Sequence, residues 1–432
     1  SFLCATATSM EQLIIYRGLQ GIGGGMIMPL SQTIIGDIFS AEQRAKWQGV
    51  FGALFGLSSV IGPFLGGLIV DHISWHWIFL INVPTGLLSA ILIYVGLKHE
   101  AIRKTEKVNI DYLGIFTLIP GIVLLLLGLT FGGDKFEWLS LESILIFGST
   151  IVFIVLFIIF ERRATEPILD LSLFKNRVFS TTNILGFLLG LGMFGAIMFV
   201  PLFMQGVLGV SPTKAGSTMT PMMIGMILSS IIGGRLLLKF RFRTVLTFGM
   251  AFATLGFFLM SMMDGSTTIF TAYSFMAILG IGMGLVMPTL MIAVQNEFPK
   301  SQLGSVTAAS TFFRSIGGTM GITILNAVMN HNLQQNMDDA VVSQKDPILH
   351  EALKALADKT DTLFNIMLYP ENLKMPAEVS NVLVQTIENA WIDAFSSVFI
   401  TGIFFVSAGI LVALSVGSGR IKRDQETEKD LG

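Results

Sequence analysis

Charged residues are scarce in this chain of 432 residues. They make up 13% of it, while hydrophobic residues make up 52%. A soluble domain carries about 25% charged residues, so a chain this apolar cannot cover itself with polar surface. The composition therefore predicts an all-α polytopic membrane protein. The net charge of −2 gives no cationic surface for a nucleic acid, and none is expected as a partner.

Cysteine and histidine are also scarce. The single Cys4 excludes an internal disulfide. The histidines are scattered without metal-ligand spacing, at His72, His76, His99, His331 and His350. Carboxylates lie only near the ends of the predicted spans, at Asp37, Glu297 and Asp393. An intramembrane enzyme needs clustered His, Asp or Glu, so we expect no enzymatic activity, no cofactor and no metal.

Apolar stretches long enough to cross a bilayer, about 20 residues each, account for most of the chain. Eleven are predicted, at about 11–36, 45–70, 75–97, 111–131, 141–160, 179–204, 214–236, 243–263, 268–293, 303–329 and 391–416. Residues 1–8 resemble the end of another helix.

Lysine and arginine predict the orientation. One set of alternate loops holds 19 of these residues, while the short loops of the other set hold only Lys135 and Lys214. The first set is therefore cytoplasmic, as is the C-terminus. All five tryptophans fall at predicted span ends, as in an aromatic belt. We expect a multi-pass protein of the plasma membrane.

Residues 331–390 form one long loop on the predicted extracellular side. It holds nine acidic residues and four lysines. The apolar spacing of Leu349, Leu353, Leu356 and Leu363 is typical of helices, which favours a small cap over the outer face. A solvated acidic tether fits the composition equally well.

Two glycine-rich helices recur when the chain is shifted by 259 residues without a gap. The aligned pairs include Gly21 with Gly280, Gly23 with Gly282, Gly25 with Gly284, Met28 with Met287 and Pro29 with Pro288. Parallel repeats of this kind build the two halves of one large transporter fold. The spans 111–131 and 141–160 lie between the halves and are interpreted as inserted.

Two motifs carry a resemblance to a known family. The pattern L-x-x-x-R-x-x-Q-G-x-G is matched by Leu13, Arg17, Gln20, Gly21 and Gly23. The pattern G-x8-G-x3-G-P-x2-G-G is matched by Gly49, Gly62, Pro63, Gly66 and Gly67, with Ser58 in place of one glycine. Asp111 with Gly114, and the run from Trp75 to Pro84, add to the match. In this order the chain resembles the major facilitator superfamily, and within it the fourteen-helix drug:proton antiporter family.

The resemblance implies the major facilitator fold, with two pseudo-symmetric helix bundles and two inserted helices. The first helix here corresponds to the family's fourth, so we expect a longer protein whose first two to three helices, and the coupling carboxylate, precede this sequence. The expected division is 1–104 for the rest of the N-terminal bundle, 105–165 for the inserted helices, 166–330 for the C-terminal bundle, 331–390 for the loop or cap, and 391–432 for the last helix and tail.

The function that the resemblance implies is proton-coupled export of lipophilic, often cationic, drugs or dyes by alternating access. A dedicated exporter of one endogenous metabolite, peptide or lipid is the alternative on the same fold. The expected partners are a small lipophilic substrate, protons and the lipid bilayer, and the protein is expected to be monomeric and driven by the proton gradient.

The candidate site residues follow. Arg17 is predicted at mid-bilayer depth, where a cation is costly and usually functional. Its repeat mate is Met276, so the fold does not demand a charge there. We assign Arg17 to proton or substrate coupling, with a structural hydrogen-bonding role as the alternative. Arg314 either snorkels to the membrane surface or has a role of its own.

The gating motif residues are Gln20, Gly21, Gly49, Gly62, Pro63, Gly66 and Gly67, whose glycines permit close helix approach. Adaptable apolar side chains are candidates either for the substrate cavity or for ordinary packing: Met26, Phe51, Phe55, Met193, Phe194, Met222, Met226, Met283, Met287 and Phe312.

Overall fold

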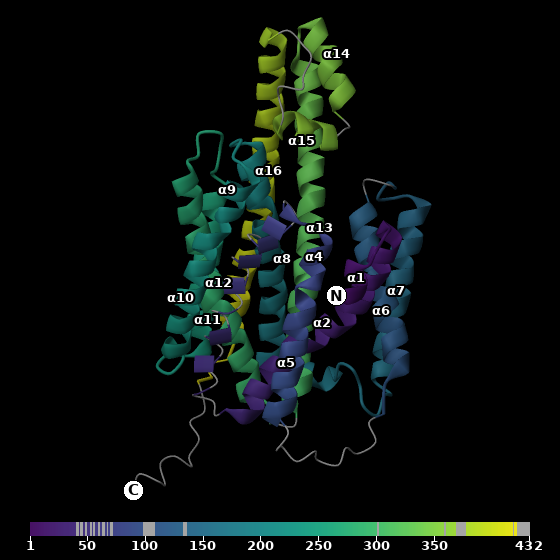
Figure 1. Ribbon diagram of the computed structural model, residues 1–432, viewed down its shortest axis with the longest axis vertical. Coiled ribbons are helices and arrows are strands. Elements are labelled where there is room, and N and C mark those ends of the chain that lie inside the picture. The colour runs from purple at the N-terminus through teal and green to yellow at the C-terminus, as the bar shows by residue number, and fades with distance from the viewer. Residues whose placement is uncertain are drawn as a thin grey trace.

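The computed structural model describes residues 1–39, 72–97, 109–132, 136–299, 302–357, 360–368, 377–417 and 419–420, with scattered positions between 43 and 69. Every named element in these ranges is a helix. Figure 1 shows a tall bundle of long helices, with an N-terminal group crossing its lower part and a separate helix pair beside it.

The C-terminal bundle contains six long helices. These are α8 (Arg177–Gly206), α10 (Met219–Leu236), α11 (Phe242–Met260), α12 (Ile269–Glu297), α13 (Leu303–Ser343) and α16 (Ala377–Ser415). The short η1 (Leu171–Lys175) precedes α8, and the short α9 (Pro212–Ser217) lies between α8 and α10. α12 packs against both α10 and α11, and α8 packs against α13 and α16. The core is rich in phenylalanine and methionine, and Phe199, Phe203, Phe257, Phe395 and Phe399 are fully buried.

Glycines set the close approach of these helices. A Cβ built on Gly280 would lie 2.0 Å from the carbonyl oxygen of Met222 on α10. On α13, a Cβ on Gly317 would lie 2.3 Å from the carbonyl oxygen of Phe187 on α8, and one on Gly321 would lie 2.3 Å from that of Leu191. Only a residue without a side chain allows two helix backbones to touch in this way.

The N-terminal group contains α1 (Phe2–Ala5), α2 (Met10–Ile38), α4 (His76–Leu80) and α5 (Asn82–Leu97). α2 contacts α13, whereas most of its length is exposed. An added Cβ at Gly21, Gly23 or Gly25 meets no atom within 4 Å. The described residues therefore do not pack the glycines of α2 as they pack the repeat-related glycines of α12.

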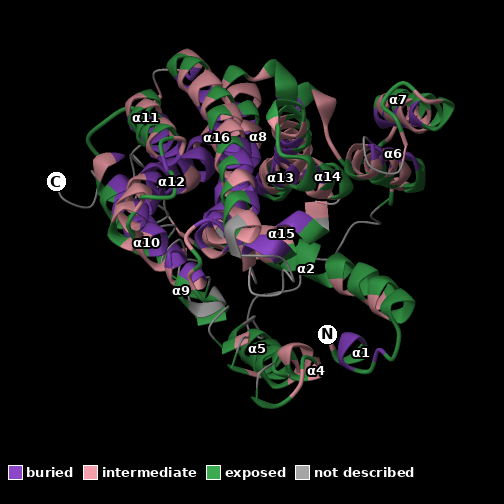
Figure 2. Ribbon diagram, turned by 90° about the horizontal axis from the view of Figure 1, so that it is seen from above, coloured by how far each residue is buried: buried purple, intermediate pink, exposed green. Residues whose placement is uncertain are grey.

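The two inserted helices, α6 (Tyr112–Phe131) and α7 (Leu141–Glu161), pack on each other beside the bundle, and α6 contacts α13 (Figure 2). Asp111 is the N-cap of α6, and its Oδ1 accepts a hydrogen bond of 2.8 Å from the backbone N–H of Gly114. The Asp and Gly of this sequence motif thus have a structural role as a helix cap.

Residues 331–390 are mainly helical where the structure describes them. At 1.5 Å per residue, the 41 residues of α13 and the 39 of α16 span about 60 Å each, twice the hydrocarbon thickness of a bilayer. Their ends project together beyond the other helices with α14 (Pro347–Leu356) and α15 (Thr360–Leu368) alongside (Figure 1). Leu333, Met337, Leu353, Leu363 and Leu383 are buried among them.

This helical extension, hereafter the cap, rests on the bundle. Phe364 of α15 meets Trp391 of α16 edge-on at 5.5 Å, and a Cβ on Gly206 of α8 would contact the side chains of Met367 and Phe364. Its shared apolar core supports the cap rather than the tether of the two sequence interpretations.

The expected spans match the described helices within a few residues, with three exceptions. The span 45–70 lies largely outside the described residues. The spans 303–329 and 391–416 are too short, because α13 continues to Ser343 and α16 begins at Ala377. Eight described helices are long and apolar enough to cross a membrane; α2 and α13, which are rich in glycine and polar residues, are not among them.

Candidate functional site

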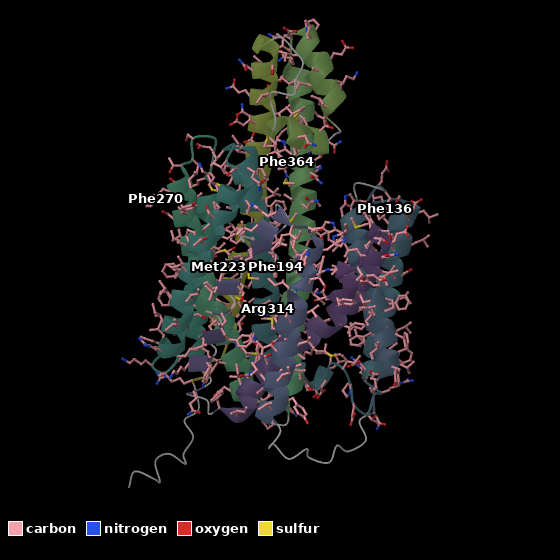
Figure 3. All side chains as sticks on the ribbon, viewed as in Figure 1. Phe136, Phe194, Met223, Phe270, Arg314 and Phe364 are labelled. Atoms are coloured by element: carbon pink, nitrogen blue, oxygen red, sulfur yellow. The ribbon has the colours of Figure 1, made fainter. Side chains whose placement is uncertain are left out.

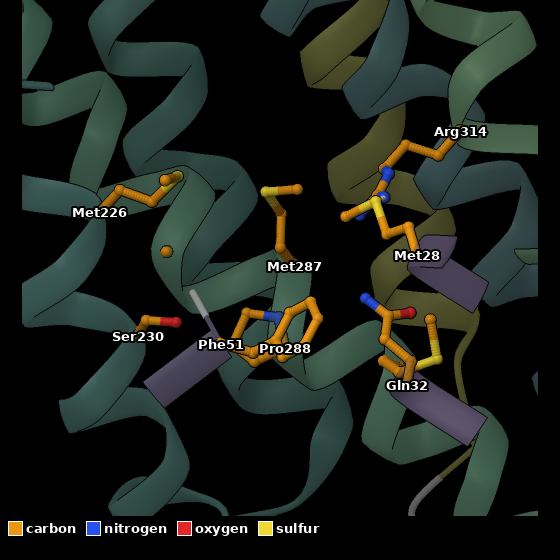
Figure 4. Close-up of a pocket in the computed structure, with 10 residues that line it drawn as sticks. Met28, Gln32, Phe51, Met226, Ser230, Met287, Pro288 and Arg314 are labelled. Atoms are coloured by element: carbon orange, nitrogen blue, oxygen red, sulfur yellow. Dashed lines mark hydrogen bonds between the residues drawn. The ribbon is translucent and has the colours of Figure 1, made fainter. Parts of the chain in front are cut away.

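A cavity lies where α2 meets the C-terminal bundle. Its described lining comes from α2, α10, α12 and α13 and from Phe51 (Figure 4): Met28, Gln32, Phe51, Met226, Ser230, Gly284, Met287, Pro288, Met291 and Arg314. It encloses about 40 Å³, which is room for a few water molecules. A drug-sized ligand needs several hundred Å³, which is more than the described residues enclose here.

Repeat-related residues of both halves line the cavity. Met28 of α2 and Met287 of α12 are repeat mates, and both line it. One helical turn further along each helix, Gln32 of α2 and Met291 of α12 are also repeat mates, and both also line the cavity. Two halves of one chain therefore present the same helix face to one shared space, which is where substrates bind in transporters built from repeats.

Arg314 is the one cation among the described lining residues. It lies 11 residues after Leu303, the first residue of α13, or about 17 Å along the helix, and Figure 3 places it at mid-height in the bundle. Its Nη2 is 3.7 Å from the sulfur of Met28 across the cavity. The guanidinium points into the protein, so of the two interpretations of this residue the structure excludes snorkelling to the surface.

Polar atoms without partners face the same region. Among the described side chains, the Oε1 of Gln32 and the Oγ of Ser230 are buried and have no hydrogen-bond partner. Unsatisfied buried polar groups are rare in proteins and call for an explanation. A binding cavity supplies one, because a ligand can provide the missing donor and acceptor.

A hydrogen-bonded contact joins the two halves at the predicted cytoplasmic side of the cavity. The Nε2 of Gln295 on α12 donates to the backbone carbonyl of Gln32 on α2, at 3.3 Å, and lies 3.2 Å from the hydroxyl of Thr307 on α13. All three residues are buried. Just beyond them, a Cβ on Gly36 would contact the side chains of Leu303 and Gln295. The three helices thus close this side of the cavity.

Arg17 lies elsewhere, on the exposed face of α2. Its Nη1 donates to the Oε1 of Gln20 at 2.6 Å, and Gln20 in turn donates to the hydroxyl of Ser1 at 2.7 Å. The guanidinium also lies 5.8 Å from the ring centre of Phe79 on α4. The structure therefore brings together the Arg and Gln of the motif but does not place Arg17 among the cavity residues. Its role in proton coupling stays a prediction.

The remaining expectations divide into three groups. Phe51, Met226 and Met287 line the cavity as expected. Others lie apart from it: Met193, Met222 and Met283 are buried in the bundle core, Met26 is 57% exposed, Phe312 is half-buried on α13, and Phe194 packs against Gly318. Gly49, Phe55, Pro63 and Gly67 lie outside the described residues.

The gating glycines that the structure describes show no close helix contact. An added Cβ at Gly21, Gly62 or Gly66 meets no atom within 4 Å, so the expected tight packing is not seen, and their role in gating stays a prediction. The sequence analysis did not assign Gln32, Ser230 and Met291 to the cavity. One signal was available for Gln32, which follows Met28 by one helical turn.

A shared cavity between two repeated halves of a multi-pass helical protein defines a secondary membrane transporter. The Major Facilitator Superfamily model matches residues 1–322, and the chain belongs to this family. It is 46% identical over 442 residues to the multidrug transporter protein MdtP of Bacillus subtilis (strain 168), covering 99% of this chain and 81% of that protein. It is 37% identical to multidrug resistance protein 3 of the same organism, covering 99% and 82%. The solved structure of a bacterial homolog to the human lysosomal transporter Spinster covers 92% of this chain and 94% of that one, with a TM-score of 0.45 and 13% identity, which is too low to add to the assignment.

Proposed function

We propose that this transporter exports lipophilic, drug-like molecules in exchange for protons by alternating access. The observation that carries the proposal is the cavity between the halves, with Met28 and Met287 facing each other from repeat-related positions. Methionine has three rotatable bonds and a polarisable sulfur, so a Met-lined site adapts to apolar ligands of different shape.

The size and closure of the cavity support alternating access. It encloses about 40 Å³, and the Gln295 contacts hold α2 to α12 and α13 on one side of it. Rocking α2 away from the bundle would break these hydrogen bonds and widen the cavity. Because a neutral hydrogen bond contributes only about 0.5–1.5 kcal/mol net, binding of a substrate or a proton can shift this balance.

Proton coupling is supported by the resemblance of the Arg17 motif to that of drug:proton antiporters. The drug-like substrate class is supported by the names of the two Bacillus relatives as multidrug proteins. A dedicated exporter of one metabolite, peptide or lipid is the second candidate. The apolar methionine lining favours export of varied drug-like molecules over export of one metabolite, since a single-substrate site needs a fixed set of polar contacts.

The test is efflux of structurally unrelated lipophilic dyes from cells that express the protein, with and without a protonophore. Efflux of several dyes that stops on adding the protonophore is the expected result. Efflux of one compound alone would favour the dedicated exporter, and efflux that a protonophore leaves unchanged would refute proton coupling.

A further inference from the structure

We infer that the cavity binds substrates through an anionic group, and that Arg314 pairs with it, so that the preferred ligands are aromatic or aliphatic molecules bearing a carboxylate. This inference rests on the proposed function and narrows its substrate class. It also departs from the lipophilic cations that the family resemblance implies.

The first argument is the unpaired charge. Arg314 is half-buried against the cavity, and its one hydrogen-bond contact among the described residues is the sulfur of Met28 at 3.7 Å. A thioether is a weak acceptor, and no carboxylate stands among the described residues that line the cavity. A cation at membrane depth is costly and normally has a partner. A ligand that brings an anion into the cavity supplies it.

The second argument is geometry. A guanidinium presents planar N–H donors that match the two oxygens of a carboxylate. Among the other described lining residues, the unpaired Ser230 hydroxyl lies across the cavity from Arg314 and can donate a hydrogen bond to the ligand, while the unpaired Gln32 amide oxygen is an acceptor for a donor elsewhere on the ligand. The other described lining residues are mainly apolar, with methionine on α2, α10 and α12. The arrangement suits an apolar body with one charged end (Figure 4).

The third argument is the internal repeat. The repeat mate of Arg314 is Phe55, so the two-fold repeated fold holds an aromatic residue at the matching position. The arginine is therefore not a requirement of the helix packing. An anionic ligand in the shared cavity explains why an arginine lies beside it.

The test compares three probes of one shape: 1-pyrenebutyrate, neutral 1-pyrenebutanol and the pyrenebutyl trimethylammonium cation. Binding to the purified full chain in detergent is followed by fluorescence anisotropy. The wild type should bind pyrenebutyrate at least about tenfold more tightly than the alcohol, since a charge-assisted pair contributes at least that much, and the cation most weakly. Equal affinities, or a preference for the cation, would overturn the inference.

Variants assign the effect to the residue. Arg314→Gln should abolish the preference for pyrenebutyrate and leave pyrenebutanol binding unchanged, while Arg314→Lys should keep part of it. Arg235→Gln, which removes an exposed cation from the end of α10, is the matched control and should behave as wild type. A full preference in Arg314→Gln would refute the pairing. If that variant does not fold, the wild-type comparison and Arg314→Lys still decide.

Transport separates this inference from the proposed function. The same probes are placed with proteoliposomes under an imposed pH gradient. Preferential binding of pyrenebutyrate without pH-driven movement of any probe would leave the recognition standing and refute proton-coupled export. Movement of all three probes at equal rates would leave export standing and refute recognition by Arg314.

Discussion

Gly280 and Gly21 occupy matching positions of the two repeats, yet the structure surrounds them differently. A Cβ on Gly280 would lie 2.0 Å from the carbonyl oxygen of Met222, and one on Gly21 meets nothing within 4 Å. We therefore predict that Gly280→Ala destabilises the protein and that Gly21→Ala does not. The pair is a matched test, because both residues lie inside helices of 29 residues.

The magnitude follows from the contact. An ordinary contact begins near 3.4 Å, so α10 and α12 must separate by about 1.4 Å, and the obstacle is backbone that cannot rotate away. Overpacking costs about 1–3 kcal/mol, and a backbone clash belongs at the upper end. Replacing glycine by alanine inside a helix gains up to about 1 kcal/mol. We therefore expect Gly280→Ala to lower the free energy of unfolding by about 2 kcal/mol and Gly21→Ala to raise it by up to about 1 kcal/mol.

Thermal unfolding in detergent, followed by tryptophan fluorescence, measures the difference. Trp391 is 2% exposed in the C-terminal bundle and reports on its unfolding. For a chain of 432 residues, a difference of about 3 kcal/mol in the free energy of unfolding corresponds to about 3 °C between the melting temperatures of the two variants. Equal melting temperatures would refute the reasoning.

Three further predictions concern the contacts between helices and the exposed arginine. Gln295→Leu removes the hydrogen bonds that close one side of the cavity, so a cysteine at Thr33 in a Cys4→Ser background should react faster with an impermeant maleimide; an unchanged rate would contradict the closure. Asp111→Ala removes the cap of α6 and should lower stability by about 1 kcal/mol, measured as a lower melting temperature, whereas Asp111→Asn keeps an acceptor and should stay near wild type; equal losses would exclude capping. Arg17→Ala breaks the pair with Gln20 and should abolish pH-driven efflux while membrane insertion, checked by fractionation, is retained; normal efflux would remove Arg17 from the mechanism.

The local sequence pattern was enough to predict most of the helices of this fold. Apolar length located the described spans because each helix must satisfy its own backbone in lipid, whatever its neighbours are. It failed at the ends of α13 and α16, which continue for 14 residues beyond the expected limits to Ser343 and Ala377. Outside the membrane, the thickness of the bilayer no longer limits the length of a helix. The ends of these two helices are instead set by the apolar core of the cap.

The candidate site was predicted less completely, for a related reason. Hydrophobicity marks Met193, Met222 and Met226 alike, since a methionine in the core and one in a cavity are the same residue on the same kind of helix. Only Met226 of these three lines the cavity, while the other two are buried in the bundle. Which face of a helix meets which neighbour depends on the rotation of each helix, and no local pattern encodes that rotation.

The sequence by itself determined the membrane setting, the helices, the repeat and the family, because these depend on composition and on spacing along one chain. The tertiary structure alone decided that Arg314 faces the cavity while Arg17 lies on an exposed face. It also decided that Gly280 packs directly against the backbone of α10, while its mate Gly21 has no such neighbour among the described residues. In sequence, a lone cation or a glycine within an apolar segment gives the same signal in both halves. Its structural role depends on which atoms of other helices lie beside it.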